Sequence, residues 1–254
     1  MNNISNDGLM GIAVIAIMMI IMIILSLPKN ITKKIILRDI EALDRLRKNI
    51  SSSIEKGKHI HIALGHANIL SPNNASSFIG LNILNKIEKI AVRSDAPPIA
   101  TSGDGTLTIL SQDTIKSACH DLKANKLYKP YHAFQSGSSP NAYVLGSLPL
   151  LQNDKISPNN MIGYWGPESG ILSASKIDNQ AYILAASESL PTQAVMLGTA
   201  DDILIGEEVF SMPAYINSKG IDVASVKAQD IIRWIIILFI SASILIKLIK
   251  GFIG

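Results

Sequence analysis

The chain has 254 residues, with 23 basic and 20 acidic side chains, a net charge of +3 and one cysteine. Its mean hydropathy is +0.30, and its charged fraction of 17% lies below the roughly 25% of ordinary globular domains. Such an apolar chain collapses or inserts into a membrane, which excludes disorder, and one cysteine excludes an intramolecular disulfide scaffold.

The first apolar segment, residues 9–27, carries no charged side chain. As an α-helix it would be roughly 28 Å long, close to the thickness of the hydrocarbon core of a bilayer. A cleaved signal peptide is the alternative, but residues 1–8 contain no Lys or Arg, and Leu27-Pro28-Lys29 is not a small-residue cleavage site. We therefore predict a transmembrane helix over 9–27, preceded by a short external tail.

The second apolar segment, residues 231–249, predicts another transmembrane helix, followed by a short tail over 250–254. Arg233 and Lys247 lie near its ends, where long side chains reach the lipid headgroups, and Trp234 suits the membrane interface. An amphipathic helix lying on the membrane is the alternative. Spanning is favoured, because the centre of the segment is apolar on all sides apart from two serines.

Residues 28–58 predict a basic amphipathic linker helix between membrane and domain. Within 29–58 there are nine basic and four acidic residues, and the apolar residues from Ile36 to Ile54 share one helical face. Three roles of this helix stay open: attraction to an anionic leaflet, self-association through the apolar stripe, or packing on the chain's own domain. Nucleic-acid binding is disfavoured, because no aromatic side chains interleave with the basic ones.

The basic residues that follow the first span set the expected orientation. By the positive-inside rule they lie in the cytoplasm, which places both termini outside, although Lys247 and Lys250 argue mildly against this. We therefore predict an inner-membrane protein with two spans and a cytoplasmic main domain. The residues expected to contact the membrane are Lys29, Lys33, Lys34, Arg38, Arg233, Trp234 and Lys247.

Residues 59–217 predict one cytoplasmic α/β domain, and a connector over 218–230 leads to the second span. We expect strands at 59–64, 98–101, 132–135, 161–164 and 181–186, and helices at 76–92, 106–122, 141–151, 167–177, 191–199 and 202–215. The loop 153–160 is expected to be exposed. Alternating strands and helices favour a mostly parallel, Rossmann-like layer sandwich, here flanked by N- and C-terminal transmembrane helices.

Ligands of such sheets bind outside the carboxyl ends of the strands, where this chain has small and polar loops. The candidate ligand-binding residues are Ser102, Gly103, Asp104, Gly105, Thr106, Glu168, Ser187 and Glu188. Asp104 could contact a ribose or a metal, and Thr106 could cap the helix that follows, but a plain tight turn is the alternative. The three acids could converge on one carboxylate site, or each could cap a helix.

Other reactive side chains do not form a recognisable motif. His59, His61 and His66 could be three ligands of one metal or three structural histidines, and their spacing does not decide between the two. Cys119 and His120 point about 100° apart on a helix, which disfavours a nucleophilic pair. The sequence contains neither of the phosphate-binding motifs G-x-x-x-x-G-K-[ST] and G-x-G-x-x-G, and it contains no G-x-S-x-G nucleophile motif. We therefore assign no cofactor, no metal and no catalytic residue.

Five stretches carry a family resemblance over residues 37–215: GHANIL, SGDGT, GSLPLL, GYWGPE and ADDILIGEEVFSMPAY. They resemble a family of bacterial integral-membrane proteins known only as a domain of unknown function. The resemblance implies a cytoplasmic α/β-like domain beside transmembrane helices. It implies no activity and no catalytic residues.

These observations favour a non-enzymatic membrane scaffold. We expect a homo-oligomer in the lipid bilayer whose domain recruits a soluble cytoplasmic protein or binds a small ligand, without nucleic acid. The alternative is a membrane-tethered nucleotide- or metal-binding enzyme or sensor that uses the crevice at the strand ends. A transport role would require an oligomer that encloses a pore, because the spans carry no ionisable residue near the bilayer centre.

Overall fold

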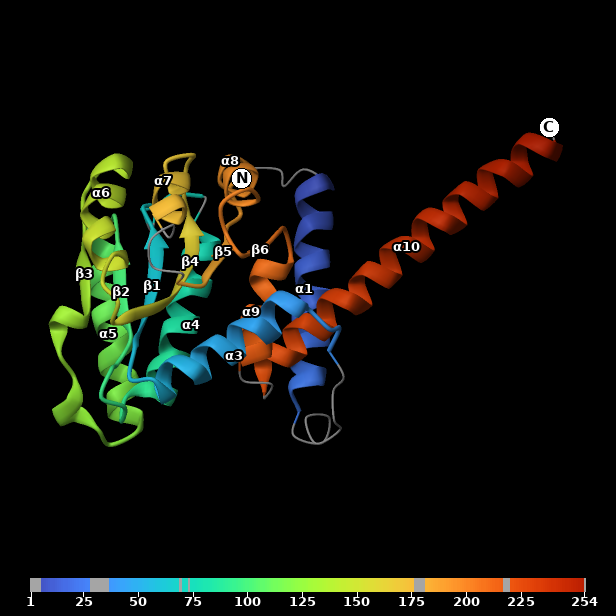
Figure 1. Cartoon of the computed structure of the whole chain (residues 1–254). Coiled ribbons are helices and arrows are strands. Elements are labelled where there is room, and N and C mark those ends of the chain that lie inside the picture. Colours follow the sequence, from blue (N-terminus) through green and yellow to red (C-terminus); the bar gives the residue numbers. More distant parts are fainter. Residues whose placement is uncertain are drawn as a thin grey trace, which may run out of the picture. The chain divides into compact units, whose positions relative to one another are not determined.

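The computed structural model describes residues 6–27, 37–68, 70–72, 74–175, 181–216 and 220–253. The chain divides into two compact units. One comprises residues 39–217, and the other comprises residues 1–38 together with 218–254. Figure 1 shows the elements of both units, which are considered separately below.

Unit 39–217 is built around a parallel β-sheet. Its six strands are β1 (His59–Gly65), β2 (Ile99–Ser102), β3 (Ala133–Gln135), β4 (Ile156–Tyr164), β5 (Ile183–Ala186) and β6 (Asp202–Leu204). They are ordered β3-β2-β1-β4-β5-β6, and every neighbouring pair is parallel (Figure 1). The prediction of a mostly parallel α/β sheet with flanking helices is confirmed.

Helices cover both faces of this sheet. They are α3 (Glu41–Glu55), α4 (Ala75–Ala91), α5 (Gly105–Asp121), α6 (Pro140–Leu151), α7 (Ser169–Ala174), α8 (Leu190–Met196) and α9 (Glu208–Ile216), with short 3-10 turns at Asn125–Leu127 and Pro130–His132. One core lies under α3, α4, α5 and α9, and the other under α6, α7 and α8. Alternation along β1 sends Ile62 and Leu64 into the first core and Ala63 into the second.

The amphipathic helix α3 is part of the α/β unit. Its apolar stripe, with Leu43, Leu46 and Ile50 buried, packs into the first core. The stripe therefore packs on the chain's own domain, which was one of the three interpretations of the linker. Residues 28–36 of that linker, with Lys29, Lys33 and Lys34, lie outside the described residues, and Arg38 precedes α3 without regular structure.

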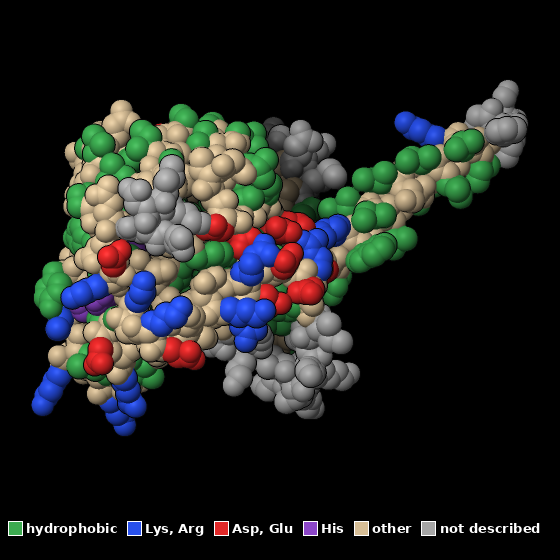
Figure 2. Space-filling view, viewed as in Figure 1, with side chains coloured by type: hydrophobic (Ala, Val, Ile, Leu, Met, Phe, Trp, Pro, Cys, Tyr) green, Lys and Arg blue, Asp and Glu red, His purple; other side chains and the backbone are tan. Residues whose placement is uncertain are grey.

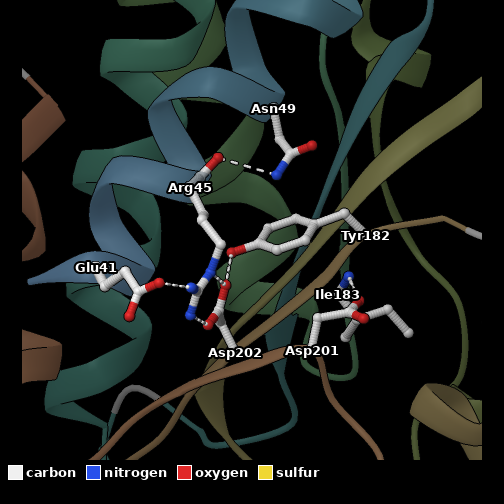
Figure 3. A network of polar contacts seen from close by, with 7 residues as sticks. All are labelled: Glu41, Arg45, Asn49, Tyr182, Ile183, Asp201 and Asp202. Atoms are coloured by element: carbon white, nitrogen blue, oxygen red, sulfur yellow. Dashed lines mark hydrogen bonds and ion pairs between the residues drawn. The ribbon is translucent and has the colours of Figure 1, made fainter.

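An ion pair ties α3 to the sheet (Figure 3). The guanidinium of Arg45 binds both carboxylate oxygens of Asp202 at the start of β6, and it also pairs with Glu41. The hydroxyl of Tyr182 donates to Asp202 over 2.6 Å. Burial raises the pKa of Asp202, but these hydrogen bonds outweigh it and hold that pKa below its ordinary value.

Two sequence predictions about this unit are wrong. Residues 153–160 are not an exposed loop, because β4 begins at Ile156 and residues 158–160 are buried. The predicted helix over 202–215 begins with a strand, β6, and helix α9 follows only at Glu208. Local preference suggested a loop at the first site and a helix at the second, and in both places pairing with neighbouring strands outweighs it.

The other unit contains α1 (Asn6–Ser26) and α10 (Ile221–Ile253), which contact each other. Among the described residues one helix, Ile221–Ile249, is long and apolar enough to cross a membrane, and Gly11–Ser26 is a shorter apolar helix. The structure thus provides one candidate span near the C-terminus, and a second span stays a prediction. Residues 221–230 of the predicted connector belong to α10.

The predicted membrane-contact residues of the second span all lie on α10. Arg233 has a carboxylate oxygen of Asp230 at 3.6 Å, one helical turn earlier. Trp234 is 66% exposed, and Lys247 is exposed near the end of the apolar stretch. All three side chains are exposed on the helix surface.

Candidate functional site

The strand order places a topological switch point between β1 and β4. From β1 the chain proceeds to β2 and β3 on one side, and from β4 it proceeds to β5 and β6 on the other. The helices that follow β1 and β4, α4 and α7, therefore pack on opposite faces of the sheet. Ligands of doubly wound sheets bind at this position.

An imidazole and a carboxylate meet at the switch point. Nε2 of His66, directly after β1, lies 2.9 Å from Oε1 of Glu168, in the loop after β4. Their side chains are 19% and 11% exposed, so the pair is partly shielded from water. The same Glu168 oxygen accepts the backbone N–H of Gly166 over 2.8 Å, which fixes the carboxylate against its own loop.

Glycines allow the backbones around this pair to approach closely. A Cβ on Gly103, in the loop after β2, would lie 2.6 Å from the Cβ of His66. Gly65, at the end of β1, has φ +77°, and a Cβ there would lie 2.2 Å from the carbonyl oxygen of Tyr164. The backbone N–H of Gly103 donates to the carbonyl of Gly65 over 2.8 Å. His66 is therefore held between the loops after β2 and β4.

Asp104 is the N-cap of α5. Its Oδ1 accepts the backbone N–H groups of Thr106 and Leu107 over 2.9 and 3.1 Å, and Asn68 donates to its other oxygen over 3.4 Å. The prediction that Thr106 is the cap is therefore wrong, because Thr106 provides a donor to the cap. Ser102 is buried, and its hydroxyl lies 2.6 Å from that of Thr108.

Ser187 and Glu188 lie after β5, one strand further from the switch point. Ser187 is buried and accepts the backbone N–H of Ser189 over 3.2 Å. Glu188 accepts the hydroxyl of Ser76 over 3.3 Å. The three predicted acids are thus held by three different sets of partners. In the part of the chain that the structure describes, no three His, Cys, Asp or Glu side chains are grouped to hold a metal.

The three histidines have different hydrogen-bond partners. His59 bonds to the carbonyl of Pro97 over 2.7 Å. His61 is buried between Oδ1 of Asn159 at 2.6 Å and Oγ1 of Thr101 at 2.9 Å, and burial lowers its pKa to about 4. Of the three, only His66 contacts a carboxylate, that of Glu168. Its role was not predicted, although the sequence places it directly after a predicted strand.

A buried polar chain continues from His61 toward the switch point. Thr101 hydrogen-bonds to the hydroxyl of Tyr143 on α6 over 3.0 Å. The ring of Tyr143 stacks on Trp165, the first residue after β4, with centroids 4.9 Å apart and an interplanar angle of 22°. Trp165 is fully buried, and its carbonyl accepts the hydroxyl of Thr192 over 2.6 Å. These contacts link β2, α6 and α8 to the residue that begins the loop of Glu168.

The carboxyl edge of the sheet has a one-sided charge. The six loops that follow the strands cover residues 66–74, 103–104, 136–139, 165–168, 187–189 and 205–207. They contain four acids, Asp104, Glu168, Glu188 and Glu207, and no Lys or Arg. Asp104 and Ser139 also occupy the backbone N–H groups that begin α5 and α6. An anionic ligand would therefore meet like charge at this edge.

The strand order and the helices on both faces of the sheet define a doubly wound α/β protein. Residues 3–254 match the family described as Domain of unknown function (DUF6754), so the chain belongs to this family. No curated protein and no solved structure matches the sequence.

Proposed function

We propose that this protein is a membrane-anchored receptor whose α/β domain binds a small ligand in the crevice between β1 and β4. The observation that carries the proposal is the His66–Glu168 pair, which lies at the position where doubly wound sheets bind ligands. The pair offers both a hydrogen-bond donor and a carboxylate acceptor to one bound molecule.

The charge of the carboxyl edge indicates the ligand class. Four acids without a basic residue favour a neutral or cationic polar molecule over a nucleotide phosphate. At two of the helices that begin at this edge, α5 and α6, the first backbone N–H groups are already bound by the chain's own Asp104 and Ser139. A ligand amine or hydroxyl would instead donate to Glu168.

Binding is a better interpretation of the site than catalysis. Two serine hydroxyls of the neighbouring loops are engaged, Ser102 with Thr108 and Ser187 with the backbone of Ser189. Cys119 belongs to the first core, away from the loops, and burial raises the pKa of its thiol to about 11. The nucleophiles of this region are therefore poorly placed to attack a ligand.

Thermal unfolding of the detergent-solubilised full-length protein tests the ligand class. The probes are arginine and spermidine as cations, adenosine as a neutral molecule and ATP as an anion. We expect at least one cationic or neutral probe to raise the melting temperature of the wild type but not of Glu168→Gln, and ATP to have no effect. Glu188→Gln is the matched control and should keep the response. Stabilisation by ATP alone would contradict the proposal.

We further propose that the domain is cytoplasmic and that 9–27 and 231–249 both span the inner membrane. The apolar helices at Gly11–Ser26 and Ile221–Ile249 support this, as do the basic residues concentrated between 29 and 47. Reporter fusions to each end of the full chain test it, because two spans place both termini on the outer side. Termini on opposite sides would reduce the count to one span.

A scaffold role, in which the domain recruits a protein, is the second candidate. It is favoured by the outer surface of α6, α7 and α8, which has no charged side chain and exposes the apolar residues Leu145, Ile171 and Leu190. Such a surface on a folded domain is typical of a protein interface. Ligand binding and scaffolding are compatible, because the crevice and this surface use different residues.

A further inference from the structure

The two edges of the sheet, where the strands begin and where they end, carry opposite charge. The loops that follow the strands contain four acids and no Lys or Arg. The segments that precede the strands contain eight Lys or Arg and four Asp, and they cover residues 56–58, 92–98, 122–132, 152–155, 175–182 and 197–201. The carboxyl edge is therefore acidic, and the amino edge is basic.

Most of the positive charge of the amino edge lies beside three neighbouring strands. The segments that lead into β3, β2 and β1 carry six basic residues and one acid, Asp95. Figure 2 shows Lys and Arg side chains gathered at the lower left of the molecule, where Figure 1 places the loop between α5 and β3. We call the loops 56–58, 92–98 and 122–132 the basic edge; its six basic residues are Lys56, Lys58, Arg93, Lys123, Lys126 and Lys129.

The charge of the basic edge is not neutralised by the chain itself. In the part of the chain that the structure describes, none of these six cations pairs with a carboxylate. Asp121, directly before loop 122–132, is already paired with Lys89 over 2.7 Å. Two of the loops also contact each other, because Nη2 of Arg93 lies 3.5 Å from the carbonyl oxygen of Leu122. The six cations thus remain available to an external anionic surface.

The longest loop of the basic edge also exposes an aromatic and an apolar side chain. Tyr131 is 65% exposed and Leu127 is 46% exposed. Nζ of Lys129 lies 5.8 Å from the centre of the Tyr131 ring. Lysines beside an exposed tyrosine and leucine suit the interface of an anionic bilayer, where the charges meet the headgroups and the apolar groups reach the acyl boundary.

The chain leaves the α/β unit from the amino edge. Helix α9 follows β6 and returns toward the beginning of the strands, because Pro213 near its end accepts Nζ of Lys86, from the last part of α4, over 2.9 Å. Only residues 217–220 separate the end of α9 at Ile216 from α10, which contains the candidate membrane span. A connection of this length covers at most roughly 18 Å, so connectivity ties α10 to the amino edge.

We propose that the basic edge binds the surface of a bilayer that contains anionic lipids. Charge complementarity favours this occupant, because six cations without carboxylate partners meet negative headgroups. The tether favours it as well, since a bilayer in which the chain is anchored is present at a high effective concentration. The carboxyl edge, with His66 and Glu168, then faces away from the bilayer. The inference rests on the proposed membrane anchoring and is independent of ligand binding.

Nucleic acids and acidic proteins are also anionic, but they match the basic edge less well. The exposed Leu127 gains nothing from a phosphate backbone, whereas the interface of a bilayer buries it. Neither of these partners is tethered to the chain, so each would have to be recruited from solution against the bilayer.

A fluorophore on the reconstituted full-length protein tests the proposal. The native Cys119 is buried, so Leu127→Cys on the basic edge and Leu70→Cys at the carboxyl edge, where Leu70 is 93% exposed, each add one accessible thiol. The vesicles contain brominated phosphatidylcholine, either alone or with about 30% phosphatidylglycerol. We expect the brominated lipid to quench the label at position 127 several-fold more strongly in the anionic vesicles, and to leave the label at position 70 unquenched in both.

Salt and charge variants show whether the lysines cause this quenching. Raising the salt from 0.1 M to 1 M shortens the Debye length from about 10 Å to about 3 Å and should remove most of it. The triple variant Lys123→Gln, Lys126→Gln, Lys129→Gln should lose the difference between the two kinds of vesicle. The same three positions changed to Arg are the matched control and should keep it, because the charge is retained.

Three outcomes would overturn the proposal: equal quenching at position 127 in both kinds of vesicle, stronger quenching at position 70, or release of the position 127 label from the lipid by single-stranded RNA. If labelling disturbs the loop, hydrogen exchange of the unlabelled protein replaces it. We then expect slower exchange of residues 122–132, and unchanged exchange of 136–139, in the anionic vesicles; equal exchange of 122–132 in both would also overturn the proposal.

Flotation of the phosphatidylcholine vesicles separates this inference from the anchoring. Protein that does not float with them contradicts the proposed membrane anchor. Protein that floats but whose label at position 127 is not quenched in the anionic vesicles contradicts the role of the basic edge alone.

Discussion

Nε2 of His66 and Oε1 of Glu168 lie 2.9 Å apart, although 102 positions separate them in the sequence. They meet because β1 and β4 are neighbours at the centre of the sheet, where the chain changes direction. This contact joins the two loops that line the switch point. The His66–Glu168 contact is the basis of the proposed ligand site. Glycines around it allow the neighbouring backbones to approach closely.

Gly103→Ala should disturb the proposed site. The added Cβ would lie 2.6 Å from the Cβ of His66, so we expect His66 to move and the protein to lose about 1–3 kcal/mol of stability. Gly105→Ala is the matched control, because its nearest neighbour would be the flexible end of Gln135 at 3.7 Å. In the helical first turn it should be neutral or stabilise by up to about 1 kcal/mol.

Denaturant unfolding and the thermal response to ligand probes measure this difference. We expect the Gly103 variant to lose both stability and the ligand response, and the Gly105 variant to keep both. Equal behaviour of the two variants would show that the close approach at Gly103 does not control the crevice.

Two buried groups should give opposite pH dependences of stability. Burial raises the pKa of Glu88, which bonds to the thiol of Cys119, from 4.5 to about 7. Stability should therefore fall as pH rises from 4.5 to 7, because only the unfolded chain loses the proton. Burial lowers the pKa of His61 from 6.5 to about 4, so stability should fall as pH decreases through that range. Between pH 4.5 and 6.5 the two slopes should largely cancel.

Glu88→Gln should reveal the His61 slope. Without the buried acid, we expect the free energy of unfolding to rise by about 3 kcal/mol as the pH increases from 4.5 to 6.5, whereas the wild type stays nearly flat. Urea unfolding of the solubilised protein at several pH values measures this. Asp113→Asn, which removes an exposed acid from α5, should keep the flat profile. A flat profile for Glu88→Gln would contradict the assignment.

Arg45→Gln should loosen α3. The change removes the ion pair with the buried carboxylate of Asp202, which links α3 to the start of β6. We expect faster amide hydrogen exchange in α3 and at the start of β6, with little change in α6. Arg47→Gln alters an exposed arginine on the same helix and should leave exchange as in the wild type. Equal exchange in both variants would show that the apolar stripe alone holds α3.

Much of the fold is readable from the sequence because the pattern is local. The strand His59–Gly65 and the helix Ala75–Ala91 lie within one residue of their predicted bounds, since their apolar spacing matches one period only. Where the pattern fails, a distant partner decides. Asn159 is predicted in a loop, but it forms part of β4 because its side chain satisfies the buried His61.

The site was predictable only in part. Glu168 is recognisable as an acid after a strand, but its partner His66 depends on strand order, which local patterns do not contain. Asp104 belongs to the predicted loop, yet its carboxylate is used to cap α5. The local sequence determines where a loop lies along the chain. The order of the strands in the sheet determines which side chains its residues contact.

We propose that the site beside His66 and Glu168 holds a small non-phosphorylated ligand. Mass spectrometry of the compounds released on denaturing the purified full-length protein tests it most directly. We expect one such compound from the wild type and from Gly105→Ala, and its loss from Glu168→Gln and Gly103→Ala. Release of a nucleotide, or equal retention of the compound by all four proteins, would contradict it.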